Sequence, residues 1–303
     1  MTKQGNPALH LIKNRRKFMA TYGNSPQDKN VYFNDPESGA EMARLLDQDR
    51  LITKGMGGLF SERRDLSGIH RILDAACGPG GWALEVAHTY PEIEVVGFDI
   101  SRAMVDYARA QARVQGLDNV EFVVMDIQKT LDFPDASFDL VNARFINFLP
   151  AAGWAKLMQE FRRITRPRGT IRLTESEWWY FTNSPALENL NAMIIRALKL
   201  QGGSFSERFT GVLPMLGRFL LDAGCASVNY KPHVIDYSFG TEAYEGFRHD
   251  AAVVFNLFQP FIVRMGVATA EEVKQLYDRM QLEMLEENFR GLMMPLTAWG
   301  EKA

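Results

Sequence analysis

Through the middle of the chain, short apolar runs alternate with longer segments whose apolar positions recur at helical spacing. The apolar runs predict five strands, over residues 72–76, 94–98, 120–124, 138–141 and 170–174. Helices are predicted between them over 82–90, over 101–115 and from Pro150 to about residue 167. Strands joined through helices of this length predict right-handed crossovers, and hence an α/β fold with a parallel sheet covered on both faces.

The two flanks of this alternation are mainly helical. A helix is predicted over 36–51, and we take residues 1–68 as an N-terminal helical lid and 69–303 as one domain. In the C-terminal part the pattern predicts helices over 186–201, 213–223, 241–265 and 269–289, and strands over 227–237 and 293–299. These helices form a predicted cap insertion in two parts, at about 182–222 and 241–289.

Composition and charge exclude several classes of protein. The 303 residues are 46% hydrophobic and carry a formal net charge of −3, which fits a folded globular chain and predicts neither a nucleic-acid partner nor a membrane. The five histidines show no metal-ligand spacing, so no metal is predicted. Two cysteines make no disulfide framework and no signal-peptide core is visible, so the chain is predicted to be cytoplasmic.

The first predicted strand leads into a glycine-rich turn, Asp74-Ala-Ala-Cys-Gly78-Pro-Gly80, which opens a helix. Backbone N–H groups at such a turn can receive a ligand. Asp99 ends the second strand, where a carboxylate can accept from a ribose diol, and Asp126 follows the third, where one can accept from an adenine amino group. Open α/β sheets bind ligands at the carboxyl ends of their strands, so these segments together predict an adenosine-containing cofactor.

Asp74 distinguishes between two classes of cofactor. The turn fits a dinucleotide fingerprint from Gly78 to Ala83, and Asp99 suits NAD as well. A carboxylate beside the turn would repel a pyrophosphate, whereas S-adenosyl-L-methionine has no phosphate and carries an ammonium and a sulfonium. Asp74 therefore favours S-adenosyl-L-methionine, and a nicotinamide-dependent oxidoreductase is kept as an alternative.

These segments resemble the class I S-adenosylmethionine-dependent methyltransferases, and in particular their small-molecule branch, which includes enzymes of secondary metabolism. The turn from Asp74 to Gly80 is similar to the first motif of the family, with Ala76 replacing its usual glycine. Further similar segments are Val96–Ser101, Met125–Ile127, Phe133–Val141, Arg166–Gly169 (with Arg168 replacing a glycine) and Leu296–Lys302. The resemblance implies a Rossmann-like, seven-stranded, mostly parallel sheet with an antiparallel last strand.

The resemblance also implies a role for each matching residue. The backbone at Ala76 and Gly78 would face the methionine moiety, and Asn142 would lie near its amino group. Asp99 would take the ribose hydroxyls and Asp126 the adenine amino group. The predicted cofactor-binding residues are Asp74, Ala76, Gly78, Gly80, Asp99, Ile100, Met104, Asp126, Ile127 and Asn142.

The methyl acceptor is expected to bind after the fourth and fifth strands and against the cap. Its candidate residues are Arg144, Phe145, Glu175, Trp178, Trp179, Tyr244 and His249. Packing of the cap explains the aromatic run 178–181 as well as a pocket wall does, and a surface position is favoured for His249. If the aromatic side chains line a pocket, the acceptor is a small apolar or aromatic molecule. No catalytic dyad is predicted, because in-line transfer from a sulfonium depends chiefly on orientation.

Three alternatives to a small-molecule methyltransferase stay open. A methyltransferase-like regulatory or binding protein would keep the fold without turnover and bind a partner through residues 178–265. A nicotinamide-dependent oxidoreductase would share the glycine-rich turn. A protein methyltransferase would need an open groove in place of a capped pocket. The sequence is compatible with a homodimer and does not separate oxygen, nitrogen and carbon as methylated atoms.

Overall fold

The computed structural model describes residues 39–63, 65–177 and 181–303. Its main sheet has seven strands in the order β3-β2-β1-β4-β5-β10-β7. The strands are β1 (Arg71–Ala75), β2 (Glu94–Asp99), β3 (Val120–Val124), β4 (Phe138–Arg144), β5 (Thr165–Glu175), β7 (Asn229–Pro232) and β10 (Leu296–Glu301). β10 runs antiparallel to both of its neighbours, while β1 to β5 pair in parallel. The predicted seven-stranded, mostly parallel sheet with an antiparallel last strand is confirmed.

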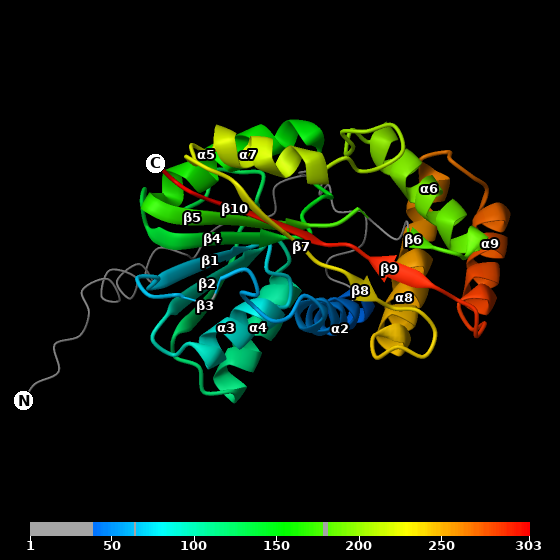
Figure 1. Cartoon of the computed structure of the whole chain (residues 1–303), viewed down its shortest axis with the longest axis horizontal. Coiled ribbons are helices and arrows are strands. Elements are labelled where there is room, and N and C mark those ends of the chain that lie inside the picture. The colour runs from blue at the N-terminus through cyan, green and yellow to red at the C-terminus, as the bar shows by residue number, and fades with distance from the viewer. Residues whose placement is uncertain (1–38, 64, 178–180) are drawn as a thin grey trace, which may run out of the picture. The chain divides into compact units, whose positions relative to one another are not determined.

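Helices cover both faces of this sheet (Figure 1). They are α3 (Gly81–Thr89) and α4 (Arg102–Val114) on one face, and α5 (Ala151–Ile164) and α7 (Leu216–Asp222) on the other. The helix α4 begins where the sequence provides a start signal. The Ser101 side chain accepts from the Met104 N–H at 3.1 Å and caps α4. The apolar side chains of α4 then recur on one helix face and are buried against β2 and β3.

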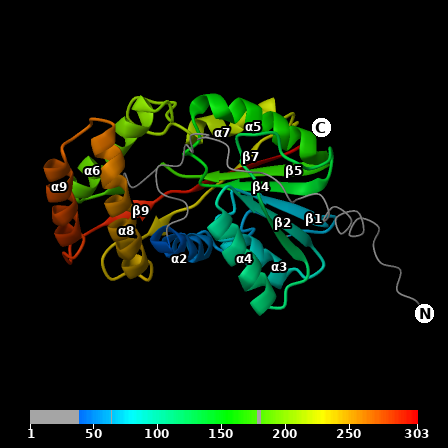
Figure 2. The ribbon, with the colours of Figure 1, turned by 180° about the vertical axis from the view of Figure 1, so that it is seen from behind.

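A cap lies beyond the carboxyl end of β5 (Figure 2). It contains α6 (Pro185–Leu200), α8 (Tyr244–Arg264) and α9 (Ala270–Glu283), and a small antiparallel sheet of β6 (Phe181–Thr182), β9 (Gly291–Met293) and β8 (Ile235–Asp236). The cap has its own apolar core, which includes Leu187, Ile194 and Phe255. No helix among the described residues is long and apolar enough to span a membrane.

The helix α2 (Gly39–Gly55) joins the cap to the sheet domain, because it packs on α8 and on α3. Its contact with α8 is electrostatic as well as apolar. Arg44 donates to Glu41 at 2.8 Å and to Asp250 on α8 at 2.9 Å, and all three side chains are buried. Gln48 donates to the second Asp250 oxygen at 3.1 Å. α2 is therefore fixed to the cap by a buried ion-pair group.

Three predicted elements near the cap were wrong in extent. The predicted strand 227–237 is divided between β7 and β8, and the predicted strand 293–299 between β9 and β10, so that each pair serves two different sheets. Pro232 and Pro295 stand at the two divisions, and proline has no N–H for a continuous ladder. The predicted helix 269–289 ends at Glu283, because a turn follows it. Residues 216–222, within the predicted cap range, form α7 against α5 and β10.

Candidate functional site

The loop between β1 and α3 takes left-handed backbone turns. Ala76 and Gly78 both have a φ of 53°, and Gly80 has a φ of 82°. The Cys77 N–H donates to the Phe98 carbonyl at 2.8 Å and fastens the loop to the end of β2. A positive φ costs glycine little, but costs alanine about 1–2 kcal/mol. Ala76 is therefore a strained residue at the start of the loop.

Two glycines at this turn lie in close contact with neighbouring elements. A Cβ on Gly80 would lie 2.7 Å from Phe122 and 2.9 Å from Ala108, so its absence allows α3 to approach β3 and α4. A Cβ on Gly81 would lie 2.5 Å from an Asp49 oxygen of α2. The Asp49 carboxylate thus approaches the N-terminus of α3, where the helix dipole favours a negative charge. The contact of Gly80 with a cofactor stays a prediction.

Asp99 connects the loop to the start of α4. Its Oδ2 accepts from the Gly78 N–H at 2.9 Å and its Oδ1 from the Ser101 N–H at 2.9 Å. These two bonds orient the Asp99 carboxylate, and its contact with ribose hydroxyls stays a prediction. Ile100 beside it is 39% exposed, and Met104 on α4 is buried. The three side chains offer one polar and one apolar surface at the end of β2.

Asp126 is brought next to Asp99 by the pairing of β2 with β3. The Met125 N–H donates to the Asp99 carbonyl at 2.9 Å, which continues the ladder by one residue. The Asp126 side chain accepts from the Gln128 N–H at 2.9 Å, and Ile127 is buried below it. The predicted ribose and adenine acids therefore lie at neighbouring strand ends.

A buried polar chain runs across the sheet from Asp74. The Asn142 amide nitrogen donates to Asp74 at 2.8 Å, and its oxygen accepts from Arg172 at 2.7 Å. Arg172 also donates to Glu62 at 2.6 Å. Asn142 thus uses both amide atoms to fix Asp74, and its contact with a methionine amino group stays a prediction.

Burial and ion pairing determine how the two carboxyl groups of this hydrogen-bonded network ionise. Burial raises the pKa of Asp74 to about 7, although Arg144 and Asn142 favour the carboxylate. Burial also acts to raise the pKa of Glu62, but the Arg172 guanidinium holds that pKa below its usual range. A cation bound near Asp74 would therefore lower the pKa of this carboxyl and favour its ionised form. Glu62 is held in its ionised form by the ion pair with Arg172.

Arg144 at the end of β4 is enclosed by α2 and α3. It donates to Thr53 at 3.0 Å, forms an ion pair with Asp49, and stacks over the Trp82 ring with its guanidinium carbon 5.5 Å from the ring centroid. The structure thus places Arg144 between α2 and the glycine-rich loop. Its contact with an acceptor stays a prediction.

The residues after β4 and β5 form a second strained group. Phe145 has a φ of 54°, and its N–H donates to the Thr174 carbonyl at 2.9 Å. The next N–H, of Ile146, donates to Glu175 Oε1 at 2.7 Å. Glu175 is 1% exposed, and Oε2 has no hydrogen-bond partner among the described residues. Two predicted acceptor residues, Phe145 and Glu175, are therefore brought together here.

The remaining acceptor candidates are placed elsewhere. The Tyr244 hydroxyl donates to the Met284 carbonyl at 2.8 Å inside the cap, and His249 is exposed on α8. Trp178 and Trp179 lie outside the described residues. Of the seven candidates, Arg144, Phe145 and Glu175 therefore share the carboxyl edge of the sheet.

The residues that support the site were not among those predicted from the sequence. Arg172 had a usable signal, because a charged residue in an apolar strand needs a buried partner. Asp49 and Thr53 had none, since nothing in a helix sequence says which distant arginine it will meet. No group of three or more metal-ligating side chains occurs in the part of the chain that the structure describes.

Residues 72–169 match a family model described as "Methyltransferase domain". This range begins in β1, and it contains Asp74, the glycine-rich loop, Asp99, Asp126 and Asn142. The residues that build the candidate cofactor site therefore lie inside the matched domain, while the cap lies outside it.

Two curated relatives match the same part of the chain. The demethylmenaquinone methyltransferase of Deinococcus radiodurans is 36% identical over 105 residues, which are 35% of this chain and 42% of that protein. The malonyl-[acyl-carrier protein] O-methyltransferase of Legionella pneumophila is 34% identical over 127 residues, which are 41% of this chain and 43% of that protein. The chain thus spans less than half the length of these relatives.

A solved structure resembles a larger part of the fold. Phosphoethanolamine N-methyltransferase 2 of Haemonchus contortus, in complex with phosphomonomethylethanolamine and S-adenosylhomocysteine, has a TM-score of 0.55 and 15% identity. The similarity covers 92% of this chain and 62% of that chain. At this identity the likeness concerns the fold alone.

Proposed function

We propose that the chain transfers a methyl group from S-adenosyl-L-methionine to a small molecule, because residues 72–169 match a family model described as "Methyltransferase domain". The observation that carries the proposal is one cluster at the carboxyl edge of the sheet. It combines the left-handed loop after β1 with Asp74, Asp99 and Asp126 at the ends of three adjacent strands.

The residues of this cluster fit such a cofactor. The position of a Cβ on Gly78 is open, since its nearest neighbour would be Leu45 Cδ1 at 3.7 Å. Ile100 presents apolar surface beside the Asp99 carboxylate, as a ribose with an attached ring requires. Asp74 is a buried carboxyl that a ligand ammonium would ionise. These features suit an adenosine with an amino-acid tail, and a buried carboxyl beside the turn disfavours a pyrophosphate.

When bound, the cofactor supplies a methyl group on a sulfonium, which is electrophilic without further activation. The work of the chain is then to hold the acceptor in line and to exclude water. Orientation of this kind can contribute about 7–11 kcal/mol to the barrier. We assign Asp99 to the ribose hydroxyls, Asp126 to the adenine amino group and Asp74 to the ammonium end.

We assign the acceptor to the space between the edge at Phe145 and the cap. The cap core is rich in aromatic and aliphatic side chains, and Phe145 packs against it. This supports a small, mainly apolar or aromatic acceptor, and the cap covering this edge disfavours a protein acceptor. The printed names of the relatives include a demethylmenaquinone, a malonyl-carrier and a phosphoethanolamine methyltransferase, so a shared core is compatible with different acceptors. A cytoplasmic location, a homodimer and the division into lid and domain stay predictions.

The test is transfer of tritium-labelled methyl from S-adenosyl-L-methionine to a panel of hydroxylated aromatic compounds, quinols and phosphoethanolamine. We expect label in a hydroxylated aromatic or a quinol, and its loss in Asp99→Ala. Binding of S-adenosylhomocysteine with no transfer to any acceptor would favour the regulatory alternative. Binding of NAD in its place would favour an oxidoreductase.

A further inference from the structure

The fold accounts for one of the two oxygens of the Glu175 carboxyl. Its Oε1 accepts from the Ile146 N–H at 2.7 Å and so supports the left-handed backbone at Phe145. Its Oε2 is fully buried without a hydrogen-bond partner of good geometry among the described residues, although the Asn147 N–H also acts on the carboxyl and favours its ionised form. A buried carboxyl oxygen is costly to leave unpaired, so a purely structural role does not account for it.

Glu177, two residues further on, is a carboxylate whose hydrogen bonds support a loop. Glu177 Oε2 accepts from the Thr210 N–H at 2.8 Å and from the Thr210 hydroxyl at 2.6 Å. It thereby anchors the loop before η2 (Leu213–Met215). Glu177 is thus the structural acid of this pair, and its negative charge acts on Glu175 together with burial to disfavour the ionised form there.

Glu175 also has the right place for contact with an acceptor. It ends β5, one residue past the pairing of Arg144 with Thr174. β4 in turn pairs with β1, where Asn142 stands opposite Asp74. Glu175 is therefore two strands from Asp74, about 10 Å across the sheet, and three residues, about 10 Å, further along the strand direction. It stands on the side where β5 leads into the cap.

We propose that Glu175 accepts the proton of the methyl acceptor, which makes it a catalytic residue and the acceptor a hydroxyl, protonated amine or acidic C–H compound. This inference rests on the proposed function. The acceptor atom forms its new bond to the methyl carbon, and the carbon–sulfur bond breaks with its electron pair moving to sulfur. The acceptor's proton goes to Glu175 Oε2, and S-adenosylhomocysteine leaves. Burial raises the pKa of the Glu175 carboxyl well above its usual range, which makes its carboxylate a stronger base, and the sulfonium of a bound methyl donor would favour that ionised form.

The first test needs no acceptor. The affinities of the full-length protein for S-adenosyl-L-methionine, which is cationic at sulfur, and for neutral S-adenosylhomocysteine are measured by calorimetry. Glu175→Gln keeps an oxygen for the Ile146 N–H but cannot ionise when a cationic ligand binds. We expect it to weaken S-adenosyl-L-methionine binding about 3- to 10-fold more than S-adenosylhomocysteine binding. The exposed Asp135→Asn is the matched control and should leave both affinities unchanged.

The second test uses turnover with an acceptor from the labelled-methyl panel. We expect Glu175→Gln to lower kcat by about 100-fold or more, with a KM and a Tm close to those of the unaltered protein. An unchanged kcat and an unchanged ratio of the two affinities would overturn the proposal and leave Glu175 as a support for Ile146. Failure of the unaltered protein to bind S-adenosylhomocysteine would instead overturn the proposed function, and this proposal with it.

Discussion

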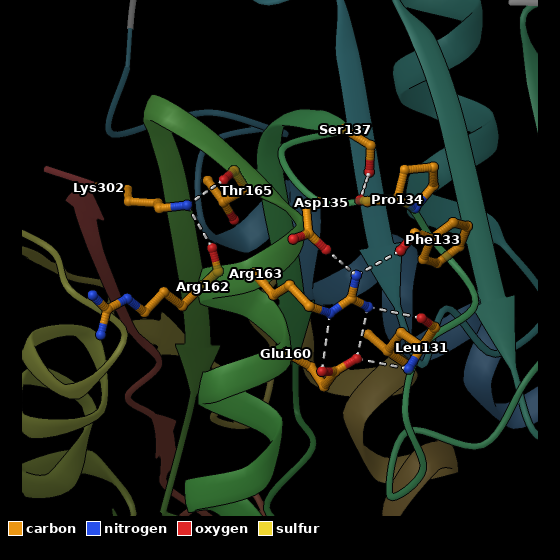
Figure 3. A network of polar contacts seen from close by, with 10 residues as sticks. All are labelled: Leu131, Phe133, Pro134, Asp135, Ser137, Glu160, Arg162, Arg163, Thr165 and Lys302. Atoms are coloured by element: carbon orange, nitrogen blue, oxygen red, sulfur yellow. Dashed lines mark hydrogen bonds and ion pairs between the residues drawn. The ribbon is translucent and has the colours of Figure 1, made fainter.

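The two ends of the parallel sheet use their charged side chains differently. At the amino ends of β4 and β5, Arg163 donates to Glu160, to Asp135 and to the carbonyls of Leu131 and Phe133 (Figure 3). At the carboxyl end, Glu175 keeps a buried oxygen without a partner among the described residues. The Arg163 network at the amino end holds the chain together, whereas the unpartnered Glu175 oxygen at the carboxyl end is placed for something that binds there.

Left-handed backbone occurs at both ends of the sheet, in different surroundings. Ala76 and Phe145 have positive φ at the carboxyl edge, where both are partly buried and directly follow β1 and β4. At the amino end, Ala136 and Arg168 also have positive φ, of 50° and 63°, and both are exposed. Strain persists only where the surrounding structure enforces it, and the strain at the carboxyl edge lies beside the candidate site.

The largest expected effect is a loss of folding stability, and we compare it between one arginine from each end of the sheet. Arg172→Met removes a buried ion-pair partner of Glu62 and a donor to Asn142, so we expect a loss of about 3–5 kcal/mol in the free energy of unfolding. Arg163→Met breaks a partly exposed network, and a loss of about 1–3 kcal/mol is expected. Denaturant unfolding measures both.

Ligand affinity separates these two arginines further. Arg172→Met should also weaken S-adenosylhomocysteine binding, because Asn142 loses the donor that orients its amide toward Asp74, while Arg163→Met should leave that affinity unchanged. Equal effects of both variants on affinity would show that the two ends do not differ in function.

The second expected effect concerns Asp99. Asp99→Ala should weaken S-adenosylhomocysteine binding by at least about tenfold, since it removes the acceptor of two ribose hydroxyls and releases the Gly78 N–H. Asp135→Ala at the amino end is the control and should bind normally. Unchanged affinity in Asp99→Ala, measured by calorimetry, would place the ribose elsewhere.

The third effect is a pH dependence of binding. The free folded protein holds the Asp74 proton up to about pH 7, whereas the unfolded chain loses it near its usual value of 3.8. Ionisation of Asp74 therefore costs stability as the pH rises through this window, and a bound ammonium offsets that cost. S-adenosylhomocysteine should bind several-fold more tightly at about pH 8 than at about pH 6. Asp74→Asn should flatten the profile, and an unflattened profile would assign the proton to another group.

The smallest effect tests the two residues that replace family glycines. Ala76→Gly and Arg168→Gly each relieve a positive φ, and each should raise the free energy of unfolding by about 1 kcal/mol or less, because glycine also adds entropy to the unfolded chain. Thermal unfolding measures both. A change in S-adenosylhomocysteine affinity is expected for Ala76→Gly alone, and the same change in Arg168→Gly would contradict the contrast between the ends.

The sheet and its flanking helices could be predicted from the sequence because local signals agree there. Apolar runs of strand length predict the strands of the sheet. The Ser101 cap predicts the start of α4, and the glycine-rich turn predicts the start of α3. The division of 227–237 between two sheets could not be predicted, because it depends on which distant strand each half meets. Local periodicity carries no information on that choice.

The candidate site shows the same limit. Asp74, Asp99 and Asp126 follow strands, and the positions of strand ends are readable from the chain. The enclosure of Arg144 by Asp49 and Thr53 depends on where α2 packs. The unpartnered oxygen of Glu175 depends on the fold around two strand ends at once. Tertiary contacts of this kind leave no spacing in the sequence.

The central claim is that the carboxyl edge of this sheet binds S-adenosyl-L-methionine. The most direct measurement is a thermal-unfolding titration with S-adenosylhomocysteine, with NAD and NADP in parallel. Ligand at about one hundred times its Kd adds about 2.7 kcal/mol of stability, which raises Tm by several degrees at this chain length. We predict a rise with S-adenosylhomocysteine alone. A rise with NAD or NADP alone, or no rise with any of the three, would contradict the account.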